Sequence, residues 1–388
     1  LSLPMGETKE LRVLESKKHD YSKKRSATFS SSWLRVLVVL LLFAGITTKG
    51  YSAVVTNYVR VEETNNSSNG KAFVTWEEAM AYLKDQPVLS DGETYTIKVL
   101  NKSKGLTMGD EMPDKPCIIT SSTKTKYTLT IPDNVNLKTD LTFDNVYLAN
   151  TNGYSSIYAG GHKLTFTKNV SVSFSGLSVY GGTSASRAPV ETTSLVLNGG
   201  SFSEVYGGCQ YSDVTCLSSI QIGGSVSVDQ MYGGCFQGNV SSGTSKKALA
   251  RITIGEGAKL TVSGSLVGGC LFYTSKCDQT EVLITDNASV SGNIYAGSAY
   301  GETGKTLLKI TGTPTIQADT RLYGGGFYDT IGNTNVIVEG GTFNTVSGGK
   351  FDAAIIGGGY ASTVTGDTHV TISGGTGIKT VCGGNRIG

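Results

Sequence analysis

Histidine, proline, charged residues and long apolar runs are all scarce in this chain. Of 388 residues only 3 are His and 7 are Pro, and charged residues make up 16%. Zinc sites need closely spaced Cys or clustered His, and neither the C-x₂₋₄-C spacing nor such a cluster occurs. The phosphate-binding pattern GxxxxGKS/T and the calcium-binding GGxGxDxUx series are also absent. We therefore expect no metal and no cofactor.

The one strongly apolar segment lies near the N-terminus. Residues 36–46 are uncharged and apolar, with a basic stretch at 16–35 before them and small residues after them. A membrane-spanning helix needs about 20 such residues, so this order predicts a secretory signal over residues 1–53. An uncleaved membrane anchor is the alternative. We expect a secreted or cell-surface protein that meets the membrane only through this segment.

The charge balance changes once that segment is set aside. Residues 1–52 hold nine Lys/Arg and four Asp/Glu, which leaves 24 cationic and 27 anionic residues and a net charge of −3 on the remainder. Nucleic-acid binding depends on clustered cations that contact phosphates. We therefore expect no nucleic-acid partner.

Residues 54–125 predict an N-terminal cap. An extended entry segment contains a strand in "VVTNYVRV" and a loop at "NNSSNG", and a helix follows over 75–84, where Thr75 and Glu78 stand at capping-box spacing. One apolar stripe repeats at helical spacing: Trp76, Ala79, Met80 and Leu83. Short strands are expected at 94–100, 117–120, 127–131, 135–139 and 141–148. The helix is expected to cover the open end of the repeat that follows.

From about residue 157 the sequence repeats. Of 51 glycines, 44 lie from residue 151 onward, and nine related marks recur 22 to 35 residues apart. They are "IYAGG" (157), "VYGG" (179), "VYGGC" (205), "MYGGC" (231), "LVGGC" (266), "IYAGS" (294), "LYGGG" (322), "IIGGG" (355) and "VCGG" (381). So short a unit cannot bury its apolar face alone and must stack on its neighbours.

The stack predicted over 126–388 is a single-stranded parallel β-helix, an all-β solenoid. Glycines would mark the corners, by positive φ or by close approach of the chain, and alternating Val, Ile, Leu and Phe would face inward. A β-propeller is the alternative, although its unit of four strands per blade is longer.

The phrase "YTLTIPDNVNLKTDLTFDNVYL" and the GGTF and YGGG units resemble the adhesin-like, pectin-lyase-like surface proteins of gut microbes. That resemblance implies a right-handed parallel β-helix displayed on a cell. The chain ends within a repeat, so we expect further sequence beyond it.

Seven cysteines leave two interpretations open. Cys209 with Cys216, and Cys270 with Cys277, could each close a loop of eight residues, worth about 2.5 kcal/mol in the chain-entropy model. Alternatively, Cys209, Cys235 and Cys270 occupy one position of successive coils as small apolar residues, since Cys235 lacks a partner at the same spacing.

Aromatic residues suggest a binding surface. Stacked coils would align two sets: Tyr206, Tyr232, Tyr295 and Tyr323 at one position, and Phe236, Phe272, Tyr300, Tyr328 and Tyr360 just after the marks. If exposed, such a stripe would offer flat apolar faces with polar tips to glycans. A buried structural ladder is the competing interpretation.

Catalytic patterns are weak. Acids that fall in loops after the marks are Asp213, Asp278, Asp329 and Asp367, and single loop acids are usually turn residues. A polysaccharide lyase or hydrolase that uses Asp213 and Asp278 is the runner-up. The sequence favours a non-catalytic structural or adhesive module, whose partners would be glycans or host surface proteins.

Overall fold

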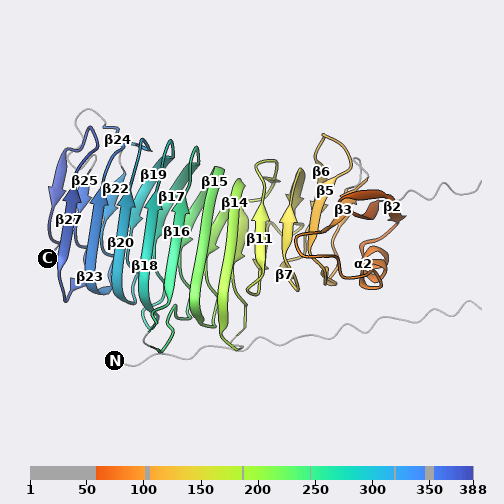
Figure 1. Ribbon diagram of the computed structural model, residues 1–388, viewed down its shortest axis with the longest axis horizontal. Helices are drawn as coiled ribbons and strands as arrows, with labels where there is room; N and C mark the ends of the chain where they lie inside the picture. Colours follow the sequence, from red (N-terminus) through yellow and green to blue (C-terminus); the bar gives the residue numbers. More distant parts are fainter. Residues whose placement is uncertain are drawn as a thin grey trace, which may run out of the picture. The chain divides into compact units, whose positions relative to one another are not determined.

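The computed structural model describes residues 58–100, 105–185, 188–244, 246–318, 320–345 and 354–387. The predicted secretory signal lies outside these residues. The described chain forms a parallel β-solenoid of about 10 turns, seen in Figure 1 as a row of coils. This confirms the predicted parallel β-helix, whereas its right hand and the domain limits stay predictions. Within the described ranges, no helix is long and apolar enough to cross a membrane.

The strands that precede the regular repeat are short: β1 (Val59–Glu63), β2 (Asn66–Phe73), β3 (Tyr95–Val99), β4 (Leu106–Thr107), β5 (Cys117–Ser121), β6 (Tyr127–Thr130), β7 (Asn134–Asn136), β8 (Leu141–Phe143), β9 (Val146–Ala149), β10 (Tyr154–Tyr158), β11 (Lys163–Phe166), β12 (Ser171–Val172) and β13 (Gly176–Tyr180). The repeat continues with β14 (Val190–Tyr206), β15 (Val214–Tyr232), β16 (Leu249–Ile254), β17 (Lys259–Val267), β18 (Lys276–Ile284), β19 (Ser289–Tyr295), β20 (Glu302–Ile310), β21 (Thr315–Ile316), β22 (Arg321–Tyr323), β23 (Thr330–Val338), β24 (Thr342–Phe343), β25 (Ala354–Ile356), β26 (Thr363–Val364), β27 (Thr368–Ile372) and β28 (Thr380–Cys382).

The repeated marks lie side by side, one in each coil. Parallel pairing places their first residues in a single row: Ile157, Val179, Val205, Met231, Leu266, Ile294, Leu322, Ile355 and Val381. The uneven spacing of the marks is therefore absorbed in the turns, where a longer loop costs little entropy.

Two different causes explain the glycines. A Cβ on Gly207 would lie 2.3 Å from the carbonyl oxygen of Gly233, so at the marks the neighbouring coil passes too close for a side chain. At other Gly-Gly pairs, such as those at 199–200 and 340–341, the cause is conformational. Gly200 has a φ of 113° and Gly341 a φ of 95°, a region that other residues avoid.

Three clusters of buried side chains run along the solenoid. The main core contains the predicted inward Val, Ile, Leu and Phe residues, among them Val205. Its neighbour Tyr206 belongs to a second, mainly aromatic cluster, because successive residues of a strand point to opposite faces. The third cluster combines four cysteines with small aliphatic residues.

A row of positions, most of them Ser or Thr, lies beside the marks, and four of its hydroxyls donate to backbone carbonyls there. The register aligns Thr193, Ser218, Ala250, Thr280, Thr306, Thr334 and Thr368. Thr193 donates to the carbonyl of Gly207 at 2.6 Å, and Ser218 donates to that of Gly233 at 2.5 Å. Each of these two bonds therefore joins a strand to the glycine that directly follows the end of the same strand.

The helix prediction is confirmed in detail. Helix α2 (Trp76–Lys84) begins at a capping box formed by Thr75 and Glu78, and its four predicted apolar residues are all buried. Lys115 caps the C-terminal end of the helix, where its Nζ donates to the carbonyls of Leu83 and Lys84 at 2.9 Å each. Helix α2 packs against β1 and β2, and Figure 1 shows it at the end where the solenoid begins. Its role as a lid stays a prediction.

Two predicted segments differ from the structure. The predicted loop "NNSSNG" lies mostly within β2, which pairs antiparallel with β1. The predicted strand 141–148 is two strands, β8 and β9, because Asn145 has a φ of 46° and turns the chain between them. The pair Asp144-Asn145 was the available sign of this corner, since Asn tolerates this conformation.

Candidate functional site

The predicted tyrosine stripe is buried. The exposed fraction is 0% for Tyr206 and Tyr323, 3% for Tyr295 and 7% for Tyr232. The rings stack from coil to coil, with centroids 4.9 Å apart for Tyr206 and Tyr232 and 4.5 Å for Tyr295 and Tyr323. Of the two interpretations that the sequence left open, the buried structural ladder is therefore correct for these four residues, and the exposed glycan stripe is wrong for them.

The turn that follows each mark covers this ladder. The ring of Phe236 meets Tyr206 edge-on at 5.7 Å, and Phe327 meets Tyr295 at 5.5 Å. Burial raises the pKa of Tyr232, another member of the ladder, to about 12. The tyrosines point away from the main core and are nevertheless dry, because the chain folds back over them.

The covering rings belong to a larger set of aromatic residues in the same turns, which we call the aromatic ridge. It consists of Tyr211, Phe236, Phe272, Tyr273, Tyr300, Phe327, Tyr328 and Tyr360. Four of its members are large exposed aromatics, with exposed fractions of 46% for Tyr211, 70% for Tyr273, 47% for Tyr300 and 50% for Tyr328. The structure therefore exposes Tyr300 and Tyr328, whereas Phe236 and Tyr360 are partly buried.

The rings of the ridge contact one another across coils. Tyr300 and Tyr328 stack with centroids 5.9 Å apart and planes within 3°, and Phe236 lies 6.2 Å from Phe272. Backbone bonds hold this alignment, since the amide of Tyr328 donates to the carbonyl of Ala299 at 2.7 Å. The ridge is thus a direct product of coil stacking.

Sequence reasoning missed three members of the ridge, Tyr211, Tyr273 and Phe327. Each lies two to four residues after a Gly-Gly pair, as do the predicted members Phe236, Phe272, Tyr328 and Tyr360. Their place relative to the mark was the available signal. At the C-terminal end Arg386 lies over the Tyr360 ring at 5.2 Å and donates to the hydroxyl of Tyr323 at 3.3 Å.

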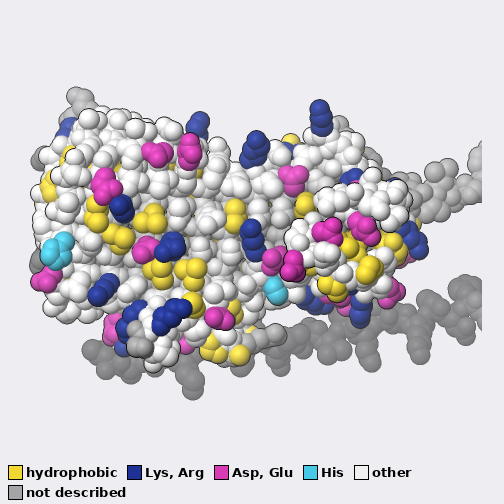
Figure 2. Space-filling view, viewed as in Figure 1, with side chains coloured by type: hydrophobic (Ala, Val, Ile, Leu, Met, Phe, Trp, Pro, Cys, Tyr) yellow, Lys and Arg dark blue, Asp and Glu magenta, His cyan; other side chains and the backbone are white. Residues whose placement is uncertain are grey.

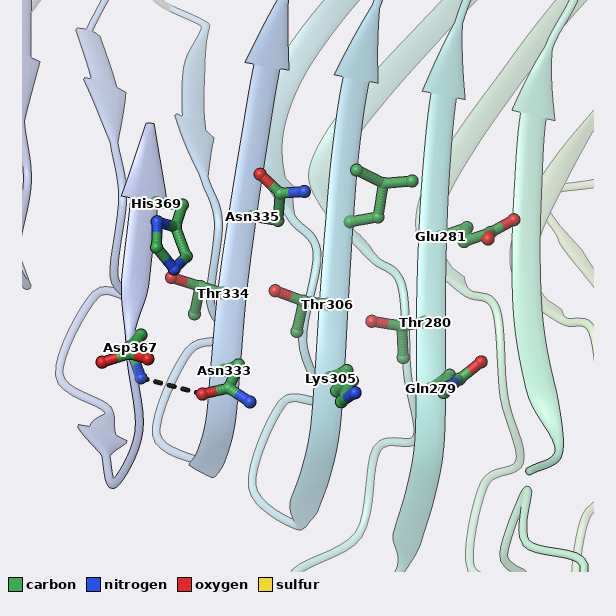
Figure 3. Close-up of a pocket in the computed structure, with 11 residues that line it drawn as sticks. Gln279, Thr280, Glu281, Lys305, Thr306, Asn333, Thr334, Asn335, Asp367 and His369 are labelled. Carbon is green, nitrogen blue, oxygen red and sulfur yellow. Dashed lines mark hydrogen bonds between the residues drawn. The ribbon is translucent and has the colours of Figure 1, made fainter. Parts of the chain in front are cut away.

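A polar trough of about 360 Å³ crosses β18, β20, β23 and β27. Figure 3 shows its side chains in rows that follow the strand register. The lining residues are Gln279, Thr280, Glu281, Lys305, Thr306, Leu307, Asn333, Thr334, Asn335, Asp367 and His369. Glu281 is paired with Arg251 at 2.7 Å. The trough thus offers mixed donors and acceptors on an open sheet face.

The loop acids of the enzymatic alternative take part in structural bonds. Asp213 Oδ1 accepts from the backbone and side-chain nitrogens of Asn239 at 2.8 and 3.0 Å. Asp278 accepts from the amides of Ser242 and Ala248, at 3.1 Å each. Burial alone would raise the pKa of Asp278, but these bonds outweigh it and lower that pKa. A general acid needs the opposite shift.

The cysteines form a row rather than two equivalent pairs. The structure holds all seven as free thiols. Cys209, Cys235, Cys270 and Cys277 lie in one buried cluster, whereas Cys216 is only half-buried and lies outside that cluster. The amide of Cys209 donates to Cys235 Sγ at 3.3 Å, and the amide of Cys235 donates to Cys270 Sγ at 3.3 Å. This confirms that the three mark cysteines share one coil position.

Charge does not single out a site. Figure 2 shows acidic and basic side chains interspersed over the face in view. Among the described residues, no group of three or more His, Cys, Asp or Glu side chains is placed to hold a metal ion. No protein-family model, curated protein or solved structure matches the chain.

Proposed function

We propose that the chain is an exported module of a cell surface, structural and adhesive in role, that binds glycan chains along the aromatic ridge. The observation that carries this proposal is the stacked pair of exposed rings at Tyr300 and Tyr328, with a third exposed ring, Tyr273, in the turn after the preceding mark. Scattered polar side chains on a sheet face need no explanation, but contiguous exposed apolar rings usually mark an interaction surface.

The chemistry of the ridge favours a sugar ligand. Tyrosine presents a flat apolar face and a hydroxyl that can bond at the rim, which suits the apolar faces and peripheral hydroxyls of a pyranose. The parallel planes of Tyr300 and Tyr328 would let one extended chain meet successive rings. The rings beneath them are packed and partly buried, so little side-chain entropy would be lost on binding.

The test is retention of the full chain on immobilised alginate, polygalacturonate and mucin-type glycans. The double substitution Tyr300→Ala with Tyr328→Ala removes two exposed rings at about 1 kcal/mol each, so affinity should fall roughly 30-fold. Tyr154→Ala is the matched control, because Tyr154 is 57% exposed but lies in β10, away from the ridge.

Three outcomes would contradict the proposal. The first is equal retention of the double variant and the control. The second is loss of retention on Lys305→Ala, which would move the site to the trough. The third is the release of new reducing ends or unsaturated products, which would show that the protein cleaves glycans.

A further inference from the structure

We propose that Cys270 and Cys277 form a disulfide in the exported protein and that Cys209 and Cys216 do not. The Sγ atoms of Cys270 and Cys277 lie 3.1 Å apart. A disulfide holds its sulfurs at about 2.05 Å, so closure needs a movement of only about 1 Å. This inference does not depend on glycan binding.

Cys270 departs from the behaviour of the other mark cysteines. Cys209 Sγ donates to the carbonyl of Asp213, and Cys235 Sγ donates to that of Asn239, in each case four residues further on. In the coil of Cys270 the corresponding thiol faces Cys277 instead. The turn therefore brings a second sulfur to the place where the other coils supply a carbonyl group.

Neighbouring coils hold both partners in position. The amide of Cys270 donates to Ser298 Oγ at 3.2 Å, and Cys277 pairs with Thr303 of β20 in parallel register. The intervening turn is closed by the amide of Ser275, which donates to the carbonyl of Phe272 at 3.0 Å. Cys216 has no such position, because it is half-buried in β15 outside the thiol cluster.

The reaction is a thiol–disulfide exchange with an oxidant that carries a disulfide. One cysteine thiolate attacks that disulfide, forms a mixed disulfide and releases one thiol of the oxidant. The second cysteine thiolate then attacks the protein sulfur of the mixed disulfide and releases the oxidant's second thiol. Two cysteine protons are lost, the cysteines are oxidised and the oxidant is reduced to two thiols. In the folded protein Cys270 is 0% and Cys277 3% exposed, so the exchange must occur during folding, before the next coil packs over the pair.

The bond would fix the loop that carries part of the aromatic ridge. Phe272 and Tyr273 lie between the two cysteines, and Tyr273 is the most exposed of the ridge tyrosines. If the ridge binds glycans, which is the function proposed above, reduction should weaken retention by loosening this loop. A failure of retention alone would count against the proposed function and leave the disulfide unaffected.

Tryptic mapping gives a direct test. Full chain refolded with glutathione disulfide is alkylated under denaturing conditions without reductant and then digested. Cleavage after Lys276 separates the two cysteines, so the predicted bond joins peptide 260–276 to peptide 277–305. Cys209, Cys216 and Cys235 share peptide 188–246. We expect the joined pair to appear with a mass two hydrogens below the sum of the reduced peptides, and to vanish with dithiothreitol.

Matched variants separate this bond from general effects on folding. Cys277→Ser should abolish the joined peptides and remove the dependence of the melting temperature on dithiothreitol, whereas Cys216→Ser should change neither. Alkylation of both Cys270 and Cys277 in the unreduced wild type would overturn the proposal. Joined peptides 188–246 and 260–276 would overturn it too, because they would place the bond between Cys270 and another mark cysteine.

Discussion

Asp329 should contribute more to the stability of the fold in mild acid than at neutral pH. Its side chain is 2% exposed and lies between coils. Oδ2 accepts from the amide of Ser298 at 2.9 Å, and Oδ1 accepts from the hydroxyl of Ser362 at 2.7 Å. Burial nevertheless raises the pKa of this carboxyl from 3.8 to about 6, because the hydrogen bonds compensate only part of the lost hydration.

The sign and size of the effect follow from the two pKa values. Below pH 3.8 the carboxyl is protonated in both states, and the stabilisation that the proton gives to the folded state is fully present. Between that pH and about 6 the folded protein retains a proton that the unfolded chain has lost, so the free energy of unfolding falls as pH rises. A difference of about two units corresponds to about 3 kcal/mol lost by pH 7.

Asp329→Asn removes the charge and can keep the contacts. The amide oxygen can accept from the amide of Ser298, and the amide nitrogen can donate to the hydroxyl of Ser362, which also donates to the carbonyl of Gly326. We expect the variant to exceed wild type by up to about 3 kcal/mol at pH 7, and to match it near pH 4. Urea midpoints followed by circular dichroism at pH 4, 5, 6 and 7 measure this.

Asp278→Asn is the control of opposite sign. Because the pKa of Asp278 is lowered, its carboxylate stabilises the fold above the unfolded-state pKa, and this stabilisation is lost as pH falls. That variant should lose stability at pH 7 and approach wild type in acid. The reasoning about Asp329 fails if Asp329→Asn keeps the wild-type slope between pH 4 and pH 6, or if it is destabilised equally at every pH.

Two further predictions concern stability. Thr280→Val removes the hydroxyl that donates to the carbonyl of Ala296 at 2.5 Å, so the free energy of unfolding measured by urea titration should fall by about 1–3 kcal/mol. Ala250→Ser, at the position of the same row that has no hydroxyl, should lower the free energy of unfolding less. An equal loss in the two variants would contradict the stabilising role of the row's hydroxyl bonds. Lys115→Met should cost about 1.5–3 kcal/mol, because two helix carbonyls lose a charged donor, and an equal effect of Lys138→Met at its exposed ion pair would refute this explanation.

The sequence predicted the coil and its inward face because both depend on local alternation. Each mark places an aliphatic residue such as Val205 toward the core, and stacking then fixes the register. The same alternation turns the side chain of Tyr206 away from the main core, so a single coil considered alone predicts that this side chain is exposed to solvent. Its burial depends on Phe236, which belongs to the next coil and covers it. The ridge could be located only once that covering turn was known.

The cysteines illustrate a requirement that is visible only across coils. In four successive coils the amide that follows the glycines of the mark points into the stack, and a side chain of the following coil accepts from it. The acceptors in order are Cys235, Cys270, Ser298 and Asp329. In the coil after Ser298 the equivalent position is Gly326, which has no side chain. Asp329 supplies the acceptor there, because its carboxyl fills the space that a side chain at position 326 would occupy.

An unpaired buried amide is costly, so this position requires an acceptor more than it requires any one residue type. Sulfur, hydroxyl and carboxylate all meet that requirement, and they differ in what else they bring. Sulfur tolerates burial with little penalty and leaves the thiol available for a bond where a second cysteine lies close, as Cys277 does. The carboxylate is the stronger acceptor but brings a charge, and this is why the coil of Asp329, unlike those of Cys235 and Cys270, should respond to pH.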